Sequence, residues 1–364
     1  MKKNKLVIAL IILTNTLIAQ NLSIPDSNFK NKLLAADVTN AIAKDNMGNN
    51  MRIDTNNDGE IQLAEALLVY QLRLMSSNIT DLTGIENFTN LINLNCEINQ
   101  ISSLDVNSLT NLQSFGCSNN QLTTLDVSNL NNLYFFTCRY NQLISLNLGT
   151  ISSLGAMDCG NNQLTSLNLS HAVALESLQC SNNLLTTLDL SGLTAITYLF
   201  CSGNQLNILD ASEQSSLQLL NCNNNLLTYL NIKNGSIEDP SSSFSGNPDL
   251  TYVCADSNQI TDIQNLATAY GYTNCTVDSS CLLNVAQQES QMLVFYPNPV
   301  DNVLNFELKD SSVKSIEIYN LLGQMLIAIS DAENTIDLSD LQSGTYLIKV
   351  NTAKGTATSK FSKK

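Results

Sequence analysis

The sequence predicts a β-rich solenoid of short 21-residue coils with a parallel β-sheet on its concave face, a small helical cap before it and a β-sandwich after it. Three observations predict this class. Seven cysteines recur at a constant interval of 21 residues, an Asp/Asn-rich loop precedes them, and short alternating apolar segments follow them. The predicted parts of the 364-residue chain are residues 1–20, 21–68, 69–285 and 286–364.

The first part has the three-part layout of a secretory signal peptide. Lys2, Lys3 and Lys5 form a basic start, residues 6–19 are mostly apolar, and a polar stretch begins at Gln20. This run is shorter than the ~20 apolar residues that a membrane span needs, so a membrane anchor is the weaker alternative and the mature chain should have no transmembrane segment. The formal charge of −15 repels phosphates and anionic lipids, which excludes nucleic-acid binding.

A loop ahead of the repeats carries oxygen-bearing side chains at regular positions. These residues are Asp54, Asn56, Asp58, Glu60, Gln62 and Glu65, with Gly59 at the sharp turn. The loop resembles the calcium loop of EF-hand and dockerin-like proteins, which implies that these six residues bind one structural Ca²⁺ ion, Glu60 through its carbonyl. The alternative is an Asn/Asp turn that caps a helix beginning near Gln62. Residues 46–53 do not form an incoming helix, so we expect a fixed cap and no regulatory opening; Asp26 should cap a short helix within it.

The regularly spaced cysteines lie in one repeated frame, apolar-x-x-apolar-x-Cys-x-x-Asn-x-Leu-x-x-Leu. They are Cys96, Cys117, Cys138, Cys159, Cys180, Cys201 and Cys222. The frame recurs from about Val69 to Leu266 and resembles the leucine-rich repeat. Because alternate strand residues face opposite sides, Leu178 and Cys180 should point inward. Neighbouring thiols would lie about 4.8 Å apart with parallel Cβ vectors, which favours buried free thiols over disulfides.

An asparagine recurs at one position of the frame. The column comprises Asn99, Asn120, Asn141, Asn162, Asn183, Asn204, Asn225 and Asn258. Each amide should bond backbone groups of the turn that a short coil cannot otherwise satisfy, so we expect a structural role. An exposed asparagine ladder that binds glycans is the alternative.

Three further cysteines lie near the end of the repeats. Ala255 takes the inward position of the last coil, which turns Cys254 outward in the neighbourhood of Cys275 and Cys281. In an oxidising export compartment we expect one disulfide, with Cys254–Cys275 preferred and one thiol left over.

After a polar joint at residues 286–291 the 21-residue period is lost. Seven segments then read as strands, at residues 293–296, 302–308, 313–319, 324–329, 334–338, 345–350 and 355–361, and predict an Ig-like β-sandwich. Four ordered motifs resemble the C-terminal sorting domain of the type IX secretion pathway, namely Tyr296-Pro297-Asn298-Pro299, Ile318 to Gln324, Ile336 to Tyr346 and Lys360 to Lys364. The resemblance implies export by the type IX machinery through the outer membrane of a Gram-negative bacterium, then release or attachment at the cell surface. An ordinary Ig-like adhesion domain is the alternative.

Two groups of side chains at outward strand positions are suited to ligand binding. The first group is Phe135, Thr137, Arg139 and Tyr140, and the second is Tyr198, Phe200, Leu219 and Tyr252. Exposed aromatic and Arg side chains concentrate binding energy, so they predict a contact surface on the concave sheet. The alternative is local packing between neighbouring rows.

Catalysis is not expected. His171 is the single histidine and should lie at the surface between coils, which disfavours a His-dependent triad or a zinc site. The sequence therefore predicts a secreted or cell-surface recognition or adhesion protein that binds a protein or polysaccharide partner. The alternatives are a structural spacer or surface-layer component without a specific ligand, and a secreted hydrolase with paired carboxylates.

Overall fold

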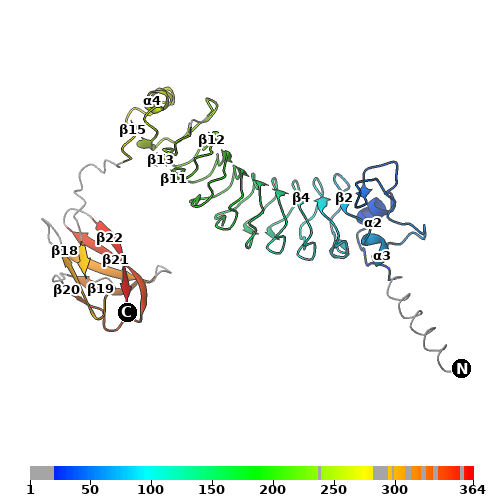
Figure 1. The fold of residues 1–364 in the computed structure, drawn as a ribbon, viewed down its shortest axis with the longest axis horizontal. Helices are drawn as coiled ribbons and strands as arrows, with labels where there is room; N and C mark the ends of the chain where they lie inside the picture. The colour runs from blue at the N-terminus through cyan, green and yellow to red at the C-terminus, as the bar shows by residue number, and fades with distance from the viewer. Residues whose placement is uncertain are drawn as a thin grey trace. The chain divides into compact units, whose positions relative to one another are not determined.

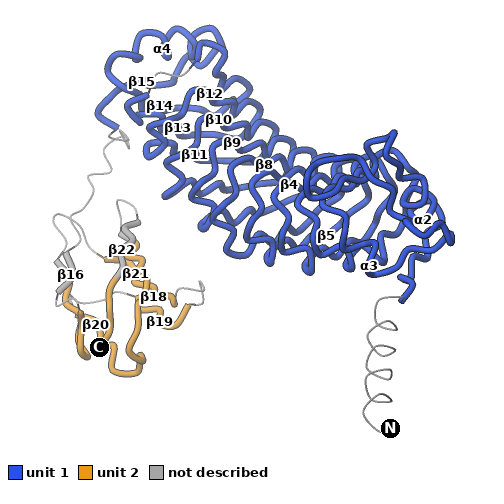
Figure 2. The backbone as a smooth tube through the Cα atoms, turned by 45° about the vertical axis from the view of Figure 1, so that its right-hand side comes forward, with its two compact units in different colours: residues 1–281 blue, residues 282–364 orange. Residues whose placement is uncertain are grey.

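The computed structural model describes residues 20–236, 239–281, 294–296, 299–307, 313–320, 325–330, 335–352 and 356–364. Residues 1–19 of the predicted signal peptide, the predicted joint at 286–291 and the motif residues 297–298 and 321–324 lie outside the described residues. The chain divides into two compact units, residues 1–281 and 282–364 (Figure 2).

The N-terminal cap begins with helix α2 (Ser27–Leu34). Asp26 precedes it, and its Oδ1 accepts hydrogen bonds of 2.8 and 2.9 Å from the second and third backbone N–H groups that follow, which confirms the predicted helix cap. The short helix α3 (Leu63–Ala66) follows the Asp/Asn-rich loop. Strand β1 (Ala43–Lys44) pairs antiparallel with β2 (Gln71–Arg73), so the cap covers the open edge of the first coil.

The coils stack one behind another (Figure 1). They are joined by a nine-stranded sheet in the order β1-β2-β3-β4-β6-β8-β9-β10-β12. Its remaining strands are β3 (Asn93–Asn95), β4 (Ser114–Gly116), β6 (Phe135–Thr137), β8 (Ala156–Asp158), β9 (Ser177–Gln179), β10 (Tyr198–Phe200) and β12 (Leu219–Asn221). From β2 onward all pairs are parallel and lie one coil apart, for example Leu178 opposite Leu199. The middle residue of each strand is buried, because each coil covers the apolar side of the next. The predicted leucine-rich-repeat solenoid is confirmed.

A second strand position in the coils was not predicted. The strands β5 (Thr124–Asp126) and β7 (Ser145–Asn147) form a two-stranded sheet, and β11 (Ile208–Asp210), β13 (Tyr229–Asn231), β14 (Tyr252–Cys254) and β15 (Thr276–Asp278) form a four-stranded parallel sheet. Their middle leucine or valine side chains also face the core. The coils that contain β5, β7, β11 and β13 therefore carry strands on two of their sides.

Both repeated columns lie inside the solenoid. The seven cysteines that recur every 21 residues, which we call the cysteine ladder, are buried free thiols, as predicted. Each asparagine amide joins two coils: Asn183 Nδ2 donates to the carbonyls of Cys159 and Cys180 at 3.1 Å each. Its Oδ1 accepts from the Leu164 N–H at 3.0 Å. The amide thus satisfies three backbone groups that a short coil leaves without partners, which confirms the structural role.

The prediction that Asn258 ends the asparagine column was wrong. The last member is Asn247, whose Nδ2 donates to the carbonyls of Cys222 at 3.2 Å and Phe244 at 2.8 Å. Asn258 is exposed in the turn before helix α4 (Ile260–Ala269). One extra residue between Cys222 and Phe244, which takes the cysteine position, moves the column off its 21-residue interval.

The prediction of a Cys254–Cys275 disulfide was also wrong. Cys254 bonds to Cys281, with their Cα atoms 5.0 Å apart, and Cys275 is a buried free thiol. Cys254 lies opposite Asp278 on the neighbouring strand. Cys281 follows Asp278 by three residues, so the turn after β15 brings it to Cys254. Cys275 has the inward direction of Val277, because alternate residues face opposite sides.

The second unit is a small antiparallel β-sandwich. One sheet contains β16 (Val294–Tyr296), β17 (Val303–Glu307) and β20 (Thr335–Asp337). The other has the order β19-β18-β21-β22, with β18 (Val313–Tyr319), β19 (Met325–Ser330), β21 (Gly344–Thr352) and β22 (Thr356–Lys363). Buried Phe306, Ile318, Ile348 and Phe361 belong to one core shared by the two sheets. The predicted seven-stranded sandwich is confirmed within the described residues.

Candidate binding surface and cation loop

The outward side chains of the nine-stranded sheet form two continuous rows, because its strands are in register. The first row is Gln71, Asn93, Ser114, Phe135, Ala156, Ser177, Tyr198 and Leu219. The second row is Arg73, Asn95, Gly116, Thr137, Asp158, Gln179, Phe200 and Asn221.

Two adjoining hollows, of about 340 and about 350 Å³, lie on this face. Both are lined by Glu97, Phe135 and Thr137; one extends to Gln179 on β9, and the other to Arg73 on β2. Phe135 stands at their junction with 48% of its surface exposed. We call the two hollows together the Phe135 groove.

The first predicted group of contact residues gathers at this groove. Phe135, Thr137 and Arg139 line it, whereas Tyr140 lies beside Arg139 with its ring centre 4.8 Å from the guanidinium carbon. Arg139 Nη1 also lies 3.5 Å from Asp158 Oδ2. Arg139 is therefore held in place by an acidic and an aromatic neighbour.

Three members of the second group share the same face. Tyr198 and Phe200 project from β10, and Leu219 lies opposite Tyr198 on β12. Phe135 and Tyr198 belong to the same row and lie three strands apart, a distance of about 14 Å. One continuous face thus carries residues of the first group and three residues of the second.

Tyr252 does not belong to this face, and its prediction as a contact residue was wrong. It lies on β14 in the four-stranded sheet, is 4% exposed and stacks on Tyr229 with ring centres 5.7 Å apart. Its hydroxyl donates to Asp278 Oδ1 at 2.6 Å. Burial, together with this bond, raises the pKa of Tyr252 to about 12. Tyr252 packs the end of the solenoid.

Sequence reasoning missed Glu97 and Arg73, which both line the groove. A signal for Glu97 was present, because later coils carry smaller or basic residues at the position directly after the cysteine, as in Ser118, Arg139 and Gly160. Glu97 is the one acidic residue that directly follows any of the seven regularly spaced cysteines, which distinguishes it from the other residues at this position.

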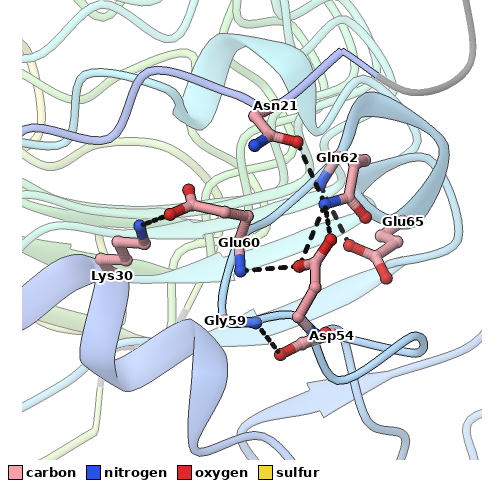
Figure 3. A network of polar contacts seen from close by, with 8 residues as sticks. Asn21, Lys30, Asp54, Gly59, Glu60, Gln62 and Glu65 are labelled. Carbon is pink, nitrogen blue, oxygen red and sulfur yellow. Dashed lines mark hydrogen bonds and ion pairs between the residues drawn. The ribbon is translucent and has the colours of Figure 1, made fainter.

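The six predicted calcium ligands lie in one compact loop, and Figure 3 labels Asp54, Glu60, Gln62 and Glu65 among them. The Asp54 carboxylate accepts hydrogen bonds from the backbone N–H groups of Asp58 at 3.1 Å and Gly59 at 3.0 Å. The Asp58 carboxylate receives the side-chain amides of Asn56 and Gln62, each at 3.0 Å. These bonds gather Asp54, Asn56 and Gln62 around Asp58.

The other two loop positions serve different contacts. Glu65 accepts from the Thr55 backbone N–H at 2.7 Å and from the Gln62 backbone N–H at 3.0 Å, so the loop also forms the Asn/Asp turn that caps α3. The Glu60 side chain pairs with Lys30 at 2.7 Å, which leaves only the Glu60 carbonyl to the loop.

The donor atoms of this loop fit a hard cation in kind. Within the described segments, no three His, Cys, Asp or Glu side chains gather closely enough to hold a metal ion by themselves. A cation would therefore need the amide oxygens of Asn56 and Gln62 and the Glu60 carbonyl beside the carboxylates. Rotation of either amide about its terminal bond presents oxygen in place of nitrogen, and an all-oxygen set is the one that Ca²⁺ prefers.

The seven regularly spaced cysteines are buried thiols that resist ionisation. Burial raises the pKa of Cys96 and Cys222 to about 12 and that of the five thiols between them well above 9.0. His171 is exposed in a turn between coils, as predicted from the sequence.

Residues 294–364 match the family model described as "Secretion system C-terminal sorting domain". The match supports the resemblance to the type IX sorting domain and indicates secretion or an outer-surface location. In the part of the chain that the structure describes, none of the helices combines the length and apolarity needed to span a bilayer.

No curated protein sequence matches the chain. Among solved structures, the functional domain of InlJ from Listeria monocytogenes, which includes a cysteine ladder, is 18% identical, with 95% of this chain and 99% of that chain covered and a TM-score of 0.32. A leucine-rich-repeat protein of Leptospira interrogans is 19% identical, with coverages of 59% and 62% and a TM-score of 0.46. Internalin C2 of L. monocytogenes is 22% identical, with coverages of 55% and 96% and a TM-score of 0.36. The chain thus carries a secretion sorting domain behind a solenoid whose likeness to these proteins concerns the fold alone.

Proposed function

We propose that this chain is an exported recognition or adhesion protein that binds a protein or polysaccharide partner with the outward face of its nine-stranded sheet. The observation that carries the proposal is the Phe135 groove, because a hollow bordered by an exposed aromatic ring is a feature of binding sites. Tyr198, Phe200 and Leu219 extend the apolar contact area along the same face. A spacer without a ligand has no need of such a surface.

Removing aromatic anchors from this face should weaken capture of a native partner. We expect Phe135→Ser or Phe200→Ser to reduce affinity about thirtyfold or more, since each deletes an anchor of the size that dominates interfaces. Arg139→Ser should reduce it less, because Asp158 already pairs with Arg139. The measurement is binding of the full chain and its variants to protein and glycan arrays.

Ile144→Ser is the matched control for this experiment. Ile144 is 58% exposed but does not line the groove, so its loss should leave capture unchanged. Equal capture by Phe135→Ser, Phe200→Ser and the unaltered chain would contradict the proposed function and favour the spacer.

We also propose that the loop from Asp54 to Glu65 binds one structural Ca²⁺ ion. The convergence of Asp54, Asn56, Asp58 and Gln62 in one turn supports this proposal. At a Ca²⁺ concentration a hundredfold above Kd, the free energy of unfolding should rise by about 2.7 kcal/mol. Thermal unfolding in Ca²⁺ and in EGTA measures the change.

Two variants separate a bound ion from a general effect of divalent cations. Asp58→Ala removes a side-chain ligand and should abolish the Ca²⁺-dependent shift in Tm. Glu60→Gln should preserve it, because position 60 offers its carbonyl and its side chain pairs with Lys30. If Ca²⁺ shifts the Tm of all three proteins equally, or of none, the loop is only a helix cap.

A further inference from the structure

Glu97 places a half-buried carboxylate in the Phe135 groove, where it lines both hollows. Its side chain lies across Gly116: a Cβ atom at position 116 would be 3.3 Å from Glu97 Cδ. One carboxylate oxygen accepts a hydrogen bond of 2.9 Å from Asn95 Nδ2, and the Glu97 backbone N–H donates to Asn95 Oδ1 at 3.1 Å. These contacts fix the direction of the carboxylate within the groove.

This carboxylate has no cationic partner among the residues that the structure describes. The ion pairs with N···O distances up to 4.0 Å there involve other acids. Of the two arginines that line the groove, Arg139 is paired with Asp158. Arg73 shares a hollow with Glu97 and lies opposite Asn95 on the neighbouring strand, but no ion pair within the described residues joins it to Glu97. A partly desolvated carboxylate in this state attracts a cation more strongly than a fully solvated one does.

The shape of the groove indicates how an incoming cation is presented. The lining extends from β2 to β9, six adjacent strands of the sheet, which corresponds to about 24 Å. About seven residues of extended polypeptide span this length. The Phe135 ring borders the same space as Glu97 and offers its face to an aliphatic stem or a cation.

We propose that the Phe135 groove binds an extended protein segment whose single Arg or Lys side chain pairs with Glu97 over Gly116. This inference rests on the proposed function, because it names the class of partner for the same surface. The net charge of −15 attracts basic partners from a distance. Arg73 repels any further basic side chain in the hollow that it shares with Glu97, so the groove selects one basic residue within a mixed segment over a polybasic one.

A random nonapeptide library displayed on phage, selected against the full chain, tests this proposal. We expect enrichment of one Arg or Lys among uncharged or acidic neighbours. A selected peptide should bind Glu97→Gln about tenfold more weakly or worse, since a charge-assisted hydrogen bond becomes a neutral one. Glu97→Lys should instead select peptides with Asp or Glu at that position.

The matched control is Glu176→Gln, which removes the same charge from an exposed residue of the solenoid outside the groove. It should keep the affinity of the unaltered chain, whereas equal losses in Glu176→Gln and Glu97→Gln would mean that net charge alone attracts the peptides and would overturn the inference.

Neutral hexasaccharides of glucose, mannose and N-acetylglucosamine distinguish this inference from the proposed function. Binding of a hexasaccharide that Phe135→Ser abolishes, without enrichment of any basic peptide, would overturn the inference and leave the proposed function standing. If neither peptides nor saccharides respond to Phe135→Ser, both proposals fail.

Discussion

Raising the pH from about 8 to about 10 should strongly destabilise the solenoid. Burial raises the pKa of all seven ladder thiols, for Cys96 and Cys222 to about 12. In the unfolded chain the same thiols ionise near 9.0, so above this pH the unfolded state binds fewer protons than the folded one and the free energy of unfolding falls. The stabilisation is complete below pH 9 and is lost progressively between about 9 and 12.

The expected size of this effect approaches the whole stability of an ordinary domain. Above pH 9 each buried thiol lowers the free energy of unfolding by about 1.4 kcal/mol per pH unit, so seven thiols lower it by about 10 kcal/mol over one pH unit. The free energy of unfolding of a typical folded protein is about 5–15 kcal/mol. Urea unfolding of the chain at several pH values measures the slope. A variant with Cys138→Ala, Cys159→Ala and Cys180→Ala should lose about three sevenths of the thiol contribution, while tyrosines and lysines contribute equally in both proteins. Identical slopes would show that the ladder does not govern alkaline stability.

Replacing one buried asparagine should destabilise the solenoid almost as strongly. Asn183→Leu leaves the carbonyls of Cys159 and Cys180 and the N–H of Leu164 without their side-chain partner. Each buried polar group left unsatisfied costs about 1–3 kcal/mol, so we expect a loss of about 3–5 kcal/mol in the free energy of unfolding. Urea denaturation measures this loss, and we expect the midpoint to fall while the m-value stays unchanged.

Gln163→Ala provides the comparison for Asn183→Leu. Gln163 directly follows the column residue of its own coil, but its side chain is exposed, so its loss should change stability by less than about 0.5 kcal/mol. A loss below about 1 kcal/mol for Asn183→Leu would mean that water or a backbone shift satisfies the three groups.

The regular coils could be predicted from the sequence because each one repeats the same buried side chains and the same asparagine hydrogen bonds. Inward Leu178 and Cys180 and the bridging Asn183 belong to a 21-residue frame that needs no distant information. The second strand position was missed, because three-residue strands such as β5 and β11 leave no alternation long enough to read.

Errors at the end of the solenoid have a common origin. The segment Tyr252 to Cys254 was assigned to the strand position of Tyr198 and Phe200, but it pairs with Tyr229 to Asn231, half a coil later. The coil around Phe244 has one extra residue and no cysteine, so it was not recognised and its second half was read as a new coil. This error placed Tyr252 in the wrong sheet and Asn258 in the wrong column. An irregular coil hides the alignment of the repeats in the sequence, and the pairing of strands in the structure reveals it.

The exposed residues of the outward face were predicted in outline, but the Phe135 groove was not. Exposed Phe135 and Arg139 could be found by residue type and strand position, whereas the hollow depends on neighbours from several coils. Whether Glu97 lacks a cationic partner is decided by side-chain directions on adjacent strands, which no single repeat encodes.

The in-register stacking of coils has a consequence for how this surface can change. Deleting or duplicating one 21-residue unit between β6 and β10 would leave matching Leu, Cys and Asn positions on both sides of the junction. The separation between Phe135 and Tyr198 would then shorten or lengthen by about 4.8 Å, one strand spacing. The distance between the two aromatic anchors can therefore evolve in whole steps, so that unequal recombination of the gene adjusts the molecule to longer or shorter partners without redesigning its interior.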